Sequence, residues 1–187
     1  MPDDDVPGEI VPDDKDWTWV LERVCPECGF DARRIDAREV GELIRANARS
    51  WVVVLGGADA AVRTRPDPDR WSILEYGAHV RDVYVLFLRR LEMMLETEDP
   101  LFPNWDQDAT AVDARYDLQD PQQVAVELRV AADALADAFD AVEDGQWTRP
   151  GRRSDGDSFT VDSFARYLIH DPVHHLWDCG VDLQSAP

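Results

Sequence analysis

Three of the four histidines in this 187-residue chain lie close together near its C-terminal end, in the segment His170-Asp171-Pro172-Val173-His174-His175. On a helix, residues four apart lie about 40° apart around the axis, so His170 and His174 share one face. His175 lies about 100° round from His174. Two imidazoles one turn apart can aim at a common point, so this pair can act as a bidentate clamp for a transition metal.

The remaining histidine, His79, is the natural third ligand. It lies in a strongly helical segment, beside an apolar stripe that includes Tyr76 and Val83. A buried imidazole needs partners for its ring nitrogens, and a metal ion is one such partner. The pattern therefore predicts a metal site of His79, His170 and His174. Three protein ligands leave coordination positions open, as catalytic sites do. The alternative is that the histidines simply pair with carboxylates.

Three acidic residues are candidates for orienting these imidazoles through hydrogen bonds. Asp171 and Asp178 lie in the histidine segment, and Glu75 lies one turn before His79. Carboxylates commonly accept the second ring N–H of a metal-ligating histidine. For both aspartates the alternative is an exposed helical carboxylate. Glu75 is more easily explained as a residue that caps its own helix.

The chain has three cysteines, two of them in the motif Cys25-Pro26-Glu27-Cys28-Gly29. This motif fits half of a zinc knuckle, a redox pair, or neither. A second Cys-x-x-Cys motif is absent, which excludes a standalone four-cysteine site.

A second zinc site can nevertheless be assembled. His175 and Cys179 lie one turn apart, on a face rotated about 100° from the His170/His174 pair. A structural zinc ion attaching the N-terminal arm to the last helix would then be held by Cys25, Cys28, His175 and Cys179. The alternative is that Cys28 and Cys179 are small buried hydrophobes, with His175 paired to Asp171.

Four amphipathic segments with helical periodicity position these residues. Capping-box patterns start the first two, at Asp36 and Ser72, and a proline at the first helical position starts the third. Pro172 is predicted to kink the last helix between His170 and His174. No strand is expected, so the predicted fold is all-α, a four-helix bundle with long crossover connections. The expected helices cover residues 36–55, 72–98, 121–143 and 160–179.

The rest of the chain divides around these helices. Residues 1–15 are acidic and predicted to be disordered, residues 16–35 form an N-terminal arm, and residues 36–183 form the bundle. Residues 99–120 lack a clear pattern, which fits either a functional lid or a long crossover. Trp105, Asp106 and Asp108 are the polar and aromatic residues of interest there. Arg152 and Arg153 could hold an anionic substrate group or pair with nearby aspartates.

The amino-acid composition excludes several classes of binding partner. A formal charge of −20, from 19 basic and 39 acidic residues, repels nucleic acid and anionic lipid. No run of 18 apolar residues and no secretory signal occurs, so we expect a cytoplasmic protein without a membrane partner. The expected partner is a small-molecule substrate, and a homodimer is left open.

The segment Trp71-Ser72-Ile73-Leu74-Glu75-Tyr76-Gly77-Ala78-His79, followed far downstream by His170-Asp171-x-x-His174, resembles the DinB-like bundles over residues 36–180. That superfamily includes mycothiol-dependent maleylpyruvate isomerases and other bacterial thiol transferases. The resemblance implies a four-helix bundle in which a zinc or nickel ion faces a cleft, held here by His79, His170 and His174. The family commonly has a glutamine near the end of its last helix, where this chain has Trp177-Asp178-Cys179. The N-terminal arm lies outside the shared bundle.

Together these observations predict a divalent-metal-dependent enzyme. An ion with open positions lowers the pKa of a bound thiol or water and polarises a carbonyl. The activity expected is that of a transferase or isomerase of small electrophiles that uses a low-molecular-weight thiol. The alternatives are a non-catalytic metal-binding bundle, acting as a sensor or partner-binding module, and a bundle whose histidines merely fill its core.

Overall fold

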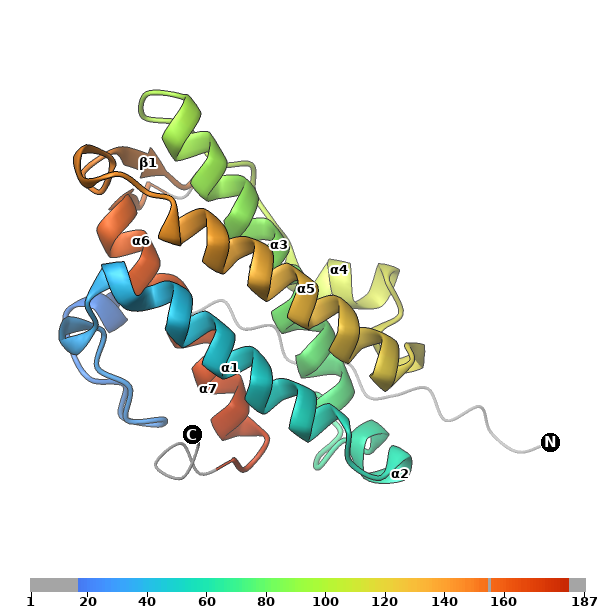
Figure 1. Cartoon of the computed structure of the whole chain (residues 1–187). Helices are drawn as coiled ribbons and strands as arrows, with labels where there is room; N and C mark the ends of the chain where they lie inside the picture. Colours follow the sequence, from blue (N-terminus) through green and yellow to red (C-terminus); the bar gives the residue numbers. More distant parts are fainter. Residues whose placement is uncertain (1–16, 155, 182–187) are drawn as a thin grey trace.

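Long helices form the body of the molecule in the computed structural model, which describes residues 17–154 and 156–181. The predicted acidic tail of residues 1–15 lies outside this range. Helix α5 packs along both α1 and α3, and the last helical segment, α6 with α7, packs against α1 and α3 (Figure 1). These main helices are α1 (Val40–Leu55), α3 (Ile73–Glu96), α5 (Pro121–Asp140), α6 (Val161–Leu168) and α7 (His170–Asp178). The prediction of an all-α four-helix bundle is confirmed.

Shorter elements connect the main helices. Helix α2 follows α1, and α4 and the 3₁₀ turn η4 lie in the long connection from α3 to α5. That connection is therefore a partly helical crossover. The short helical elements are η1 (Thr18–Leu21), η2 (Ala32–Arg34), η3 (Ala37–Glu39), α2 (Asp59–Arg63), α4 (Gln107–Asp113), η4 (Tyr116–Leu118) and η5 (Asp144–Gln146).

Side-chain caps start the helices close to the predicted positions. The Ser72 side chain accepts a hydrogen bond from the Glu75 backbone N–H, and the Glu75 side chain accepts one from the Ser72 backbone, which completes a capping box. Asp120 caps α5, with Pro121 at its first position. Asp36 caps the η3 turn, so regular α-helix starts only at Val40.

The last helix is broken before its histidines. α6 ends at Leu168 and α7 begins at His170, with Ile169 between them. A proline ring clashes with the carbonyl four residues earlier, which for Pro172 is that of Leu168. The predicted kink is therefore present, but it lies on the N-terminal side of both His170 and His174 rather than between them.

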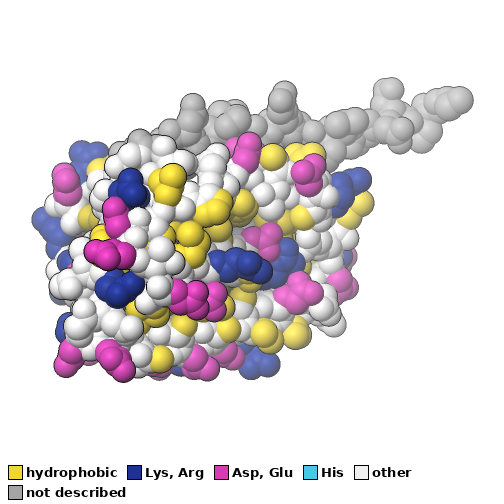
Figure 2. Space-filling view, turned by 90° about the horizontal axis from the view of Figure 1, so that it is seen from above, with side chains coloured by type: hydrophobic (Ala, Val, Ile, Leu, Met, Phe, Trp, Pro, Cys, Tyr) yellow, Lys and Arg dark blue, Asp and Glu magenta, His cyan; other side chains and the backbone are white. Residues whose placement is uncertain are grey.

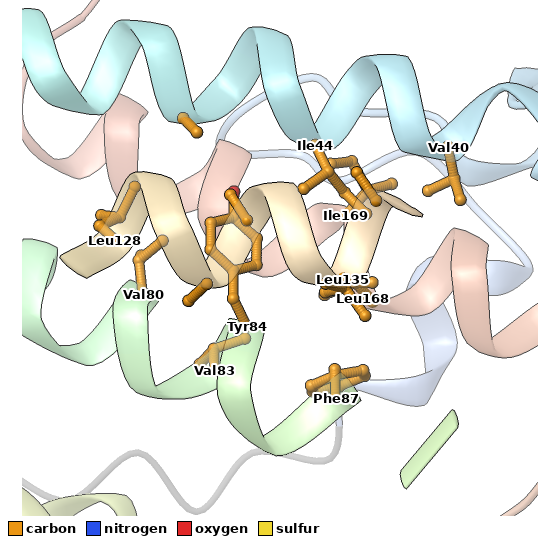
Figure 3. Close-up of a cluster of buried hydrophobic side chains, with 14 of the residues drawn as sticks. Val40, Ile44, Val80, Val83, Tyr84, Phe87, Leu128, Leu135, Leu168 and Ile169 are labelled. Atoms are coloured by element: carbon orange, nitrogen blue, oxygen red, sulfur yellow. The ribbon is translucent and has the colours of Figure 1, made fainter. Parts of the chain in front are cut away.

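The core lies between the main helices, and Figure 3 shows its central residues. Tyr84 of α3 is completely buried, and its hydroxyl donates a hydrogen bond of 2.7 Å to Asn47 Oδ1 of α1. Trp51 of α1, also completely buried, donates through Nε1 to the Pro172 carbonyl of α7 at 3.2 Å. These two bonds satisfy buried polar groups and tie α1 to α3 and to α7.

One expectation about secondary structure is wrong. The segment after α5, for which no strand was expected, forms an antiparallel hairpin of β1 (Pro150–Arg152) and β2 (Ser158–Thr160). Gly151 pairs with Phe159 in this hairpin. Three residues per strand are too few for a period-two hydrophobic pattern to show in the sequence.

The N-terminal arm packs against α6 through η1 and η2, with Val20 and Ala32 completely buried. On the face shown in Figure 2, acidic and basic side chains are interspersed, with hydrophobic ones exposed between them. Within residues 17–154 and 156–181, none of the helices combines the length and apolar character needed to cross a bilayer.

Candidate metal centres

Two groups of potential metal ligands lie on neighbouring faces of α7. The first group contains His79 of α3 with Asp171 and His175 of α7, and one ligand atom of each lies within 4.8 Å of the others. His79 Nε2 is 3.5 Å from Asp171 Oδ2, and His175 Nε2 is 3.8 Å from the same oxygen. Two imidazole nitrogens and a carboxylate oxygen thus converge on one point.

Several buried polar atoms of this first group have no hydrogen-bond partner among the described residues, which a bound cation would explain. Both ring nitrogens of His79 and Oδ1 of Asp171 are buried and make no hydrogen bond within the described part of the chain. A buried polar group without a partner costs about 1–3 kcal/mol, so such atoms need an explanation. A metal ion between the two side chains would satisfy one ring nitrogen of His79 and one oxygen of Asp171.

The neighbouring residues hold the two imidazoles in place. His175 Nδ1 lies 2.8 Å from Asp178 Oδ2, so a proton on Nδ1 leaves Nε2 available as a ligand. The ring of Tyr76 stacks on His175 at 4.8 Å between centroids, and that of Trp105 stacks on His79 at 5.5 Å. These contacts restrict the orientation of both rings.

Both carboxylates near these histidines favour the ionised form. Burial by itself would raise the pKa of Asp171, but the charges of His79 and His175 hold it well below its ordinary value. Burial likewise opposes a lowered pKa for Asp178, and the hydrogen bond from His175 overcomes it. A carboxylate that stays ionised is a competent metal ligand or hydrogen-bond acceptor at neutral pH.

The first group lies at the wall of a cavity of about 760 Å³. Asp171 and His175 line the cavity, while His79 lies behind them, 1% exposed. The remaining lining is partly aromatic and partly charged, and it includes Trp71, Tyr76, Arg90, Trp105, Arg153 and Tyr167.

Arg153 is both a cavity residue and an ion-pair partner. Its Nη1 lies 3.7 Å from Asp157 Oδ2 and donates to the Tyr167 hydroxyl at 3.1 Å. Arg152 instead pairs with Asp99 at 2.9 Å, away from the cavity. Of the two arginines singled out in the sequence, only Arg153 can contact a ligand there.

The second group contains Cys25, Cys28, His170 and His174, with one ligand atom of each within 4.8 Å of the others. Burial lowers the pKa of His170 to about 4 and also lowers that of His174, so both rings are neutral at physiological pH. Burial raises the pKa of Cys28 to about 12, so its free thiol is a poor nucleophile.

The structure thus regroups the residues predicted from the sequence. His79 does not join His170 and His174, and His175 and Cys179 do not join the two arm cysteines. The reason is the rotation of α7 about its axis. Consecutive residues differ by about 100°, so when Asp171 and His175 face α3, the residues just before them face the arm.

The remaining candidates have other roles. Glu75 caps α3 and forms an ion pair with Arg65, so it does not orient a ligand. Cys179 is half-buried, and burial raises its pKa to about 12. Asp171, predicted to orient a histidine, lies within 4.8 Å of His79 and His175 through its carboxylate and is therefore a candidate ligand. The sequence signal for this role was its position four residues before His175, which places both side chains on one face of a helix. Carboxylates are ordinary zinc ligands.

Comparison with known protein families matches residues 42–179 to the DinB superfamily. Among solved structures, the fold is similar to that of YfiT from Bacillus subtilis, with a TM-score of 0.65 and 18% identity over 84% of this chain and 88% of that one. YfiT is described as a probable metal-dependent hydrolase with an unusual four-helix bundle topology. No curated protein matches the chain. Because the family match spans most of the sequence, from the first turn of α1 to the end of α7, this chain belongs to the DinB superfamily.

Proposed function

We propose that this protein is a divalent-metal-dependent enzyme whose ion is held by His79, Asp171 and His175. The observation that carries this proposal concerns buried His79 and half-buried Asp171, which lie beside a cavity of about 760 Å³. Both ring nitrogens of His79 and Oδ1 of Asp171 are buried and make no hydrogen bond within the described part of the chain. An ion held there by three protein ligands keeps a position open, lowers the pKa of a bound thiol or water, and polarises a carbonyl.

The ligand types narrow the choice of metal. Imidazole nitrogens suit zinc, nickel, copper and iron, whereas magnesium and calcium prefer sites built from oxygen. Two imidazoles with one carboxylate therefore favour a transition metal, and zinc or nickel is our choice.

The cavity indicates the kind of substrate. Small-molecule sites usually measure about 300–1,000 Å³, so this cavity can hold a small electrophile together with a second small reactant. Trp71, Tyr76 and Trp105 offer flat apolar surfaces. Arg90 and Arg153 bring positive charge into an otherwise strongly acidic protein, which favours a substrate with a carboxylate or a similar anionic group.

The nucleophile we propose is a low-molecular-weight thiol, which makes the enzyme a thiol-dependent transferase or isomerase. The chain's own cysteines do not serve this purpose, because Cys25, Cys28 and Cys179 are absent from the described cavity lining. Asp178 keeps His175 oriented through the 2.8 Å contact between its Oδ2 and His175 Nδ1. The cavity has room for a thiol beside the electrophile.

Hydrolysis is the second candidate. It needs the same three ligands with water in place of the thiol, and it is the activity proposed for the structurally similar YfiT. A third outcome, a metal-binding bundle without catalysis, would show ion binding with neither activity.

The test compares His79→Ala with the wild type, and Asp133→Asn serves as a control because Asp133 lies in an exposed ion pair on α5. Metal content, thermal midpoint and two activities are measured. One activity is conjugation of a small activated electrophile with an added thiol, and the other is hydrolysis of an activated ester without thiol.

We expect His79→Ala to lose one ion per chain and its thiol-dependent activity, while the control keeps both. The fold should survive, because the core rests on apolar packing between helices. Thiol-independent ester hydrolysis would favour the hydrolase. An unchanged ion content in His79→Ala would refute the assigned ligand set.

A further inference from the structure

The motif at Cys25–Gly29 forms a closed turn that places both thiols on one side. The Cys25 backbone N–H donates to the Phe30 carbonyl at 2.8 Å, and the Gly29 N–H donates to the Cys25 carbonyl at 2.9 Å. Gly29 has a φ of +76°, a conformation that glycine adopts without steric cost. The two sulfur atoms are thus presented together by local backbone geometry.

Opposite this turn lies the second face of α7. His170 and His174 are one helical turn apart, and their ring centroids are separated by 5.1 Å. His174 Nδ1 lies 3.7 Å from Cys25 Sγ, although 149 positions separate these residues in the sequence. All four ligand side chains are at least partly buried, with Cys25, His170 and His174 between 1% and 6% exposed.

Two features of the histidines fit a metal ion rather than ordinary core packing. His170 Nε2 is buried and makes no hydrogen bond with any described residue. His174 points Nδ1 toward the Cys25 sulfur, while its Nε2 lies 3.3 Å from Glu27 Oε2. A ligating histidine commonly gives its second ring N–H to a carboxylate in this way.

The spacing of the four ligand atoms fits tetrahedral zinc. Zinc–sulfur bonds of about 2.3 Å and zinc–nitrogen bonds of about 2.0–2.1 Å place neighbouring ligand atoms roughly 3.3–3.8 Å apart. The Cys25–His174 pair, at 3.7 Å, already meets this requirement, and the whole set lies within 4.8 Å. The longest separation between ligand atoms would have to shorten by about 1 Å to reach the spacing of tetrahedral zinc ligands.

Aromatic rings surround the two histidines, which also line the cavity. The Trp17 ring lies 5.3 Å from the His170 ring and 5.1 Å from that of His174, and Phe30 lies 5.6 Å from His170. With two thiols and two imidazoles, all four positions of a tetrahedral ion are taken by the protein, which leaves none for a substrate.

We propose that Cys25, Cys28, His170 and His174 bind a structural zinc ion that fastens the N-terminal arm to α7. The arm contributes Trp17 and Glu27 to the cavity lining, so this ion completes the cavity wall. Its two histidine ligands directly precede Asp171 and His175, so one rotation of α7 presents both groups of ligands. This site does not depend on the activity proposed above.

The experiment uses cobalt(II) on the purified full-length chain after removal of bound metal. Cobalt bound by cysteine gives an intense thiolate charge-transfer absorption, whereas the group of His79, Asp171 and His175 contains no sulfur. The absorption therefore reports the second site alone. The variants are the double substitution Cys25→Ser/Cys28→Ser, the matched control Cys179→Ser, and His79→Ala.

We expect an absorption that corresponds to one thiolate-bound cobalt per chain in the wild type, Cys179→Ser and His79→Ala, and its complete loss in Cys25→Ser/Cys28→Ser. Persistence of the absorption in the double variant, or its absence from the wild type, would overturn the proposal. If His79→Ala keeps the absorption but also keeps its other ion, the proposed enzyme site fails while the structural site stands.

Thiol titration of the wild type covers the case in which the double variant does not fold. With zinc present, Cys25 and Cys28 should not react with a thiol reagent in the native protein, and a chelator should add these two thiols to the reactive ones. Equal reactivity with and without zinc, or a Cys25–Cys28 disulfide that zinc does not prevent under mild oxidation, would overturn the proposal in favour of a redox pair.

Discussion

Asp178 is the residue at which the two candidate metal centres meet. Its Oδ2 lies 2.8 Å from His175 Nδ1 in the first group and 3.8 Å from His174 Nε2 in the second. Only the shorter contact is a hydrogen bond, so Asp178 mainly orients His175. Glu27 is the nearer carboxylate for His174, at 3.3 Å.

Substituting Asp178→Asn should therefore weaken metal binding by His79, Asp171 and His175 about 10–100-fold, the usual cost of losing a carboxylate that orients a ligating histidine. Affinity can be measured by competition with a chromophoric chelator, with the exposed Asp133→Asn as control. The cobalt–thiolate absorption of the other site should change little. An affinity equal to that of the wild type would mean that Asp178 does not orient His175.

At the level of secondary-structure elements, the short hairpin of β1 and β2 packs tightly against the bundle. Gly151 of β1 lies against the C-terminal half of α3 and the crossover segment. A Cβ atom added at this position would lie 2.6 Å from Phe102 Cζ and 2.8 Å from Met94 Cγ. Both neighbours are completely or almost completely buried, so neither has free space to move into.

We predict that Gly151→Ala lowers the free energy of unfolding by about 1–3 kcal/mol, the usual cost of overpacking a core. Gly145→Ala is the matched control, because nothing lies within 4 Å of its added Cβ atom. Denaturant unfolding of both variants provides the measurement. Equal stability of the two would show that the hairpin shifts to make room without cost.

For the whole molecule, the dominant electrostatic property is its net charge of −20. Many acidic side chains are paired at close range, for example Glu75 with Arg65 and Glu127 with Arg81, but unpaired carboxylates repel one another over longer distances. The Debye length falls from about 30 Å at 0.01 M salt to about 8 Å at 0.15 M, so salt screens the long-range repulsion first.

Thermal stability should therefore rise when sodium chloride is increased from 0.01 to 0.15 M. For a chain of this size, each kcal/mol gained raises Tm by about 2–4 °C. A thermal scan in a buffer of constant pH measures the change, and the metal content must be checked at both salt concentrations. A fall in Tm would mean that attractive ion pairs outweigh the net repulsion.

Much of the fold is determined by local chemistry that the sequence displays. The Ser72–Glu75 capping box, the Asp120-Pro121 start of α5 and the helical spacing of the apolar residues each depend on groups within a few residues of one another. Pro172 likewise predicted an interrupted last helix, although the break lies at Ile169 because the ring clashes with the carbonyl of Leu168.

Tertiary structure decided which residues come together as candidate metal ligands. A spacing of four residues is met equally by His170 with His174, by Asp171 with His175, and by His175 with Cys179, so periodicity alone cannot choose among them. The choice depends on how α7 is rotated against α3 and the arm, and one residue changes that angle by about 100°. Long-range packing set the rotation, so His79 meets Asp171 and His175 while the arm cysteines meet His170 and His174.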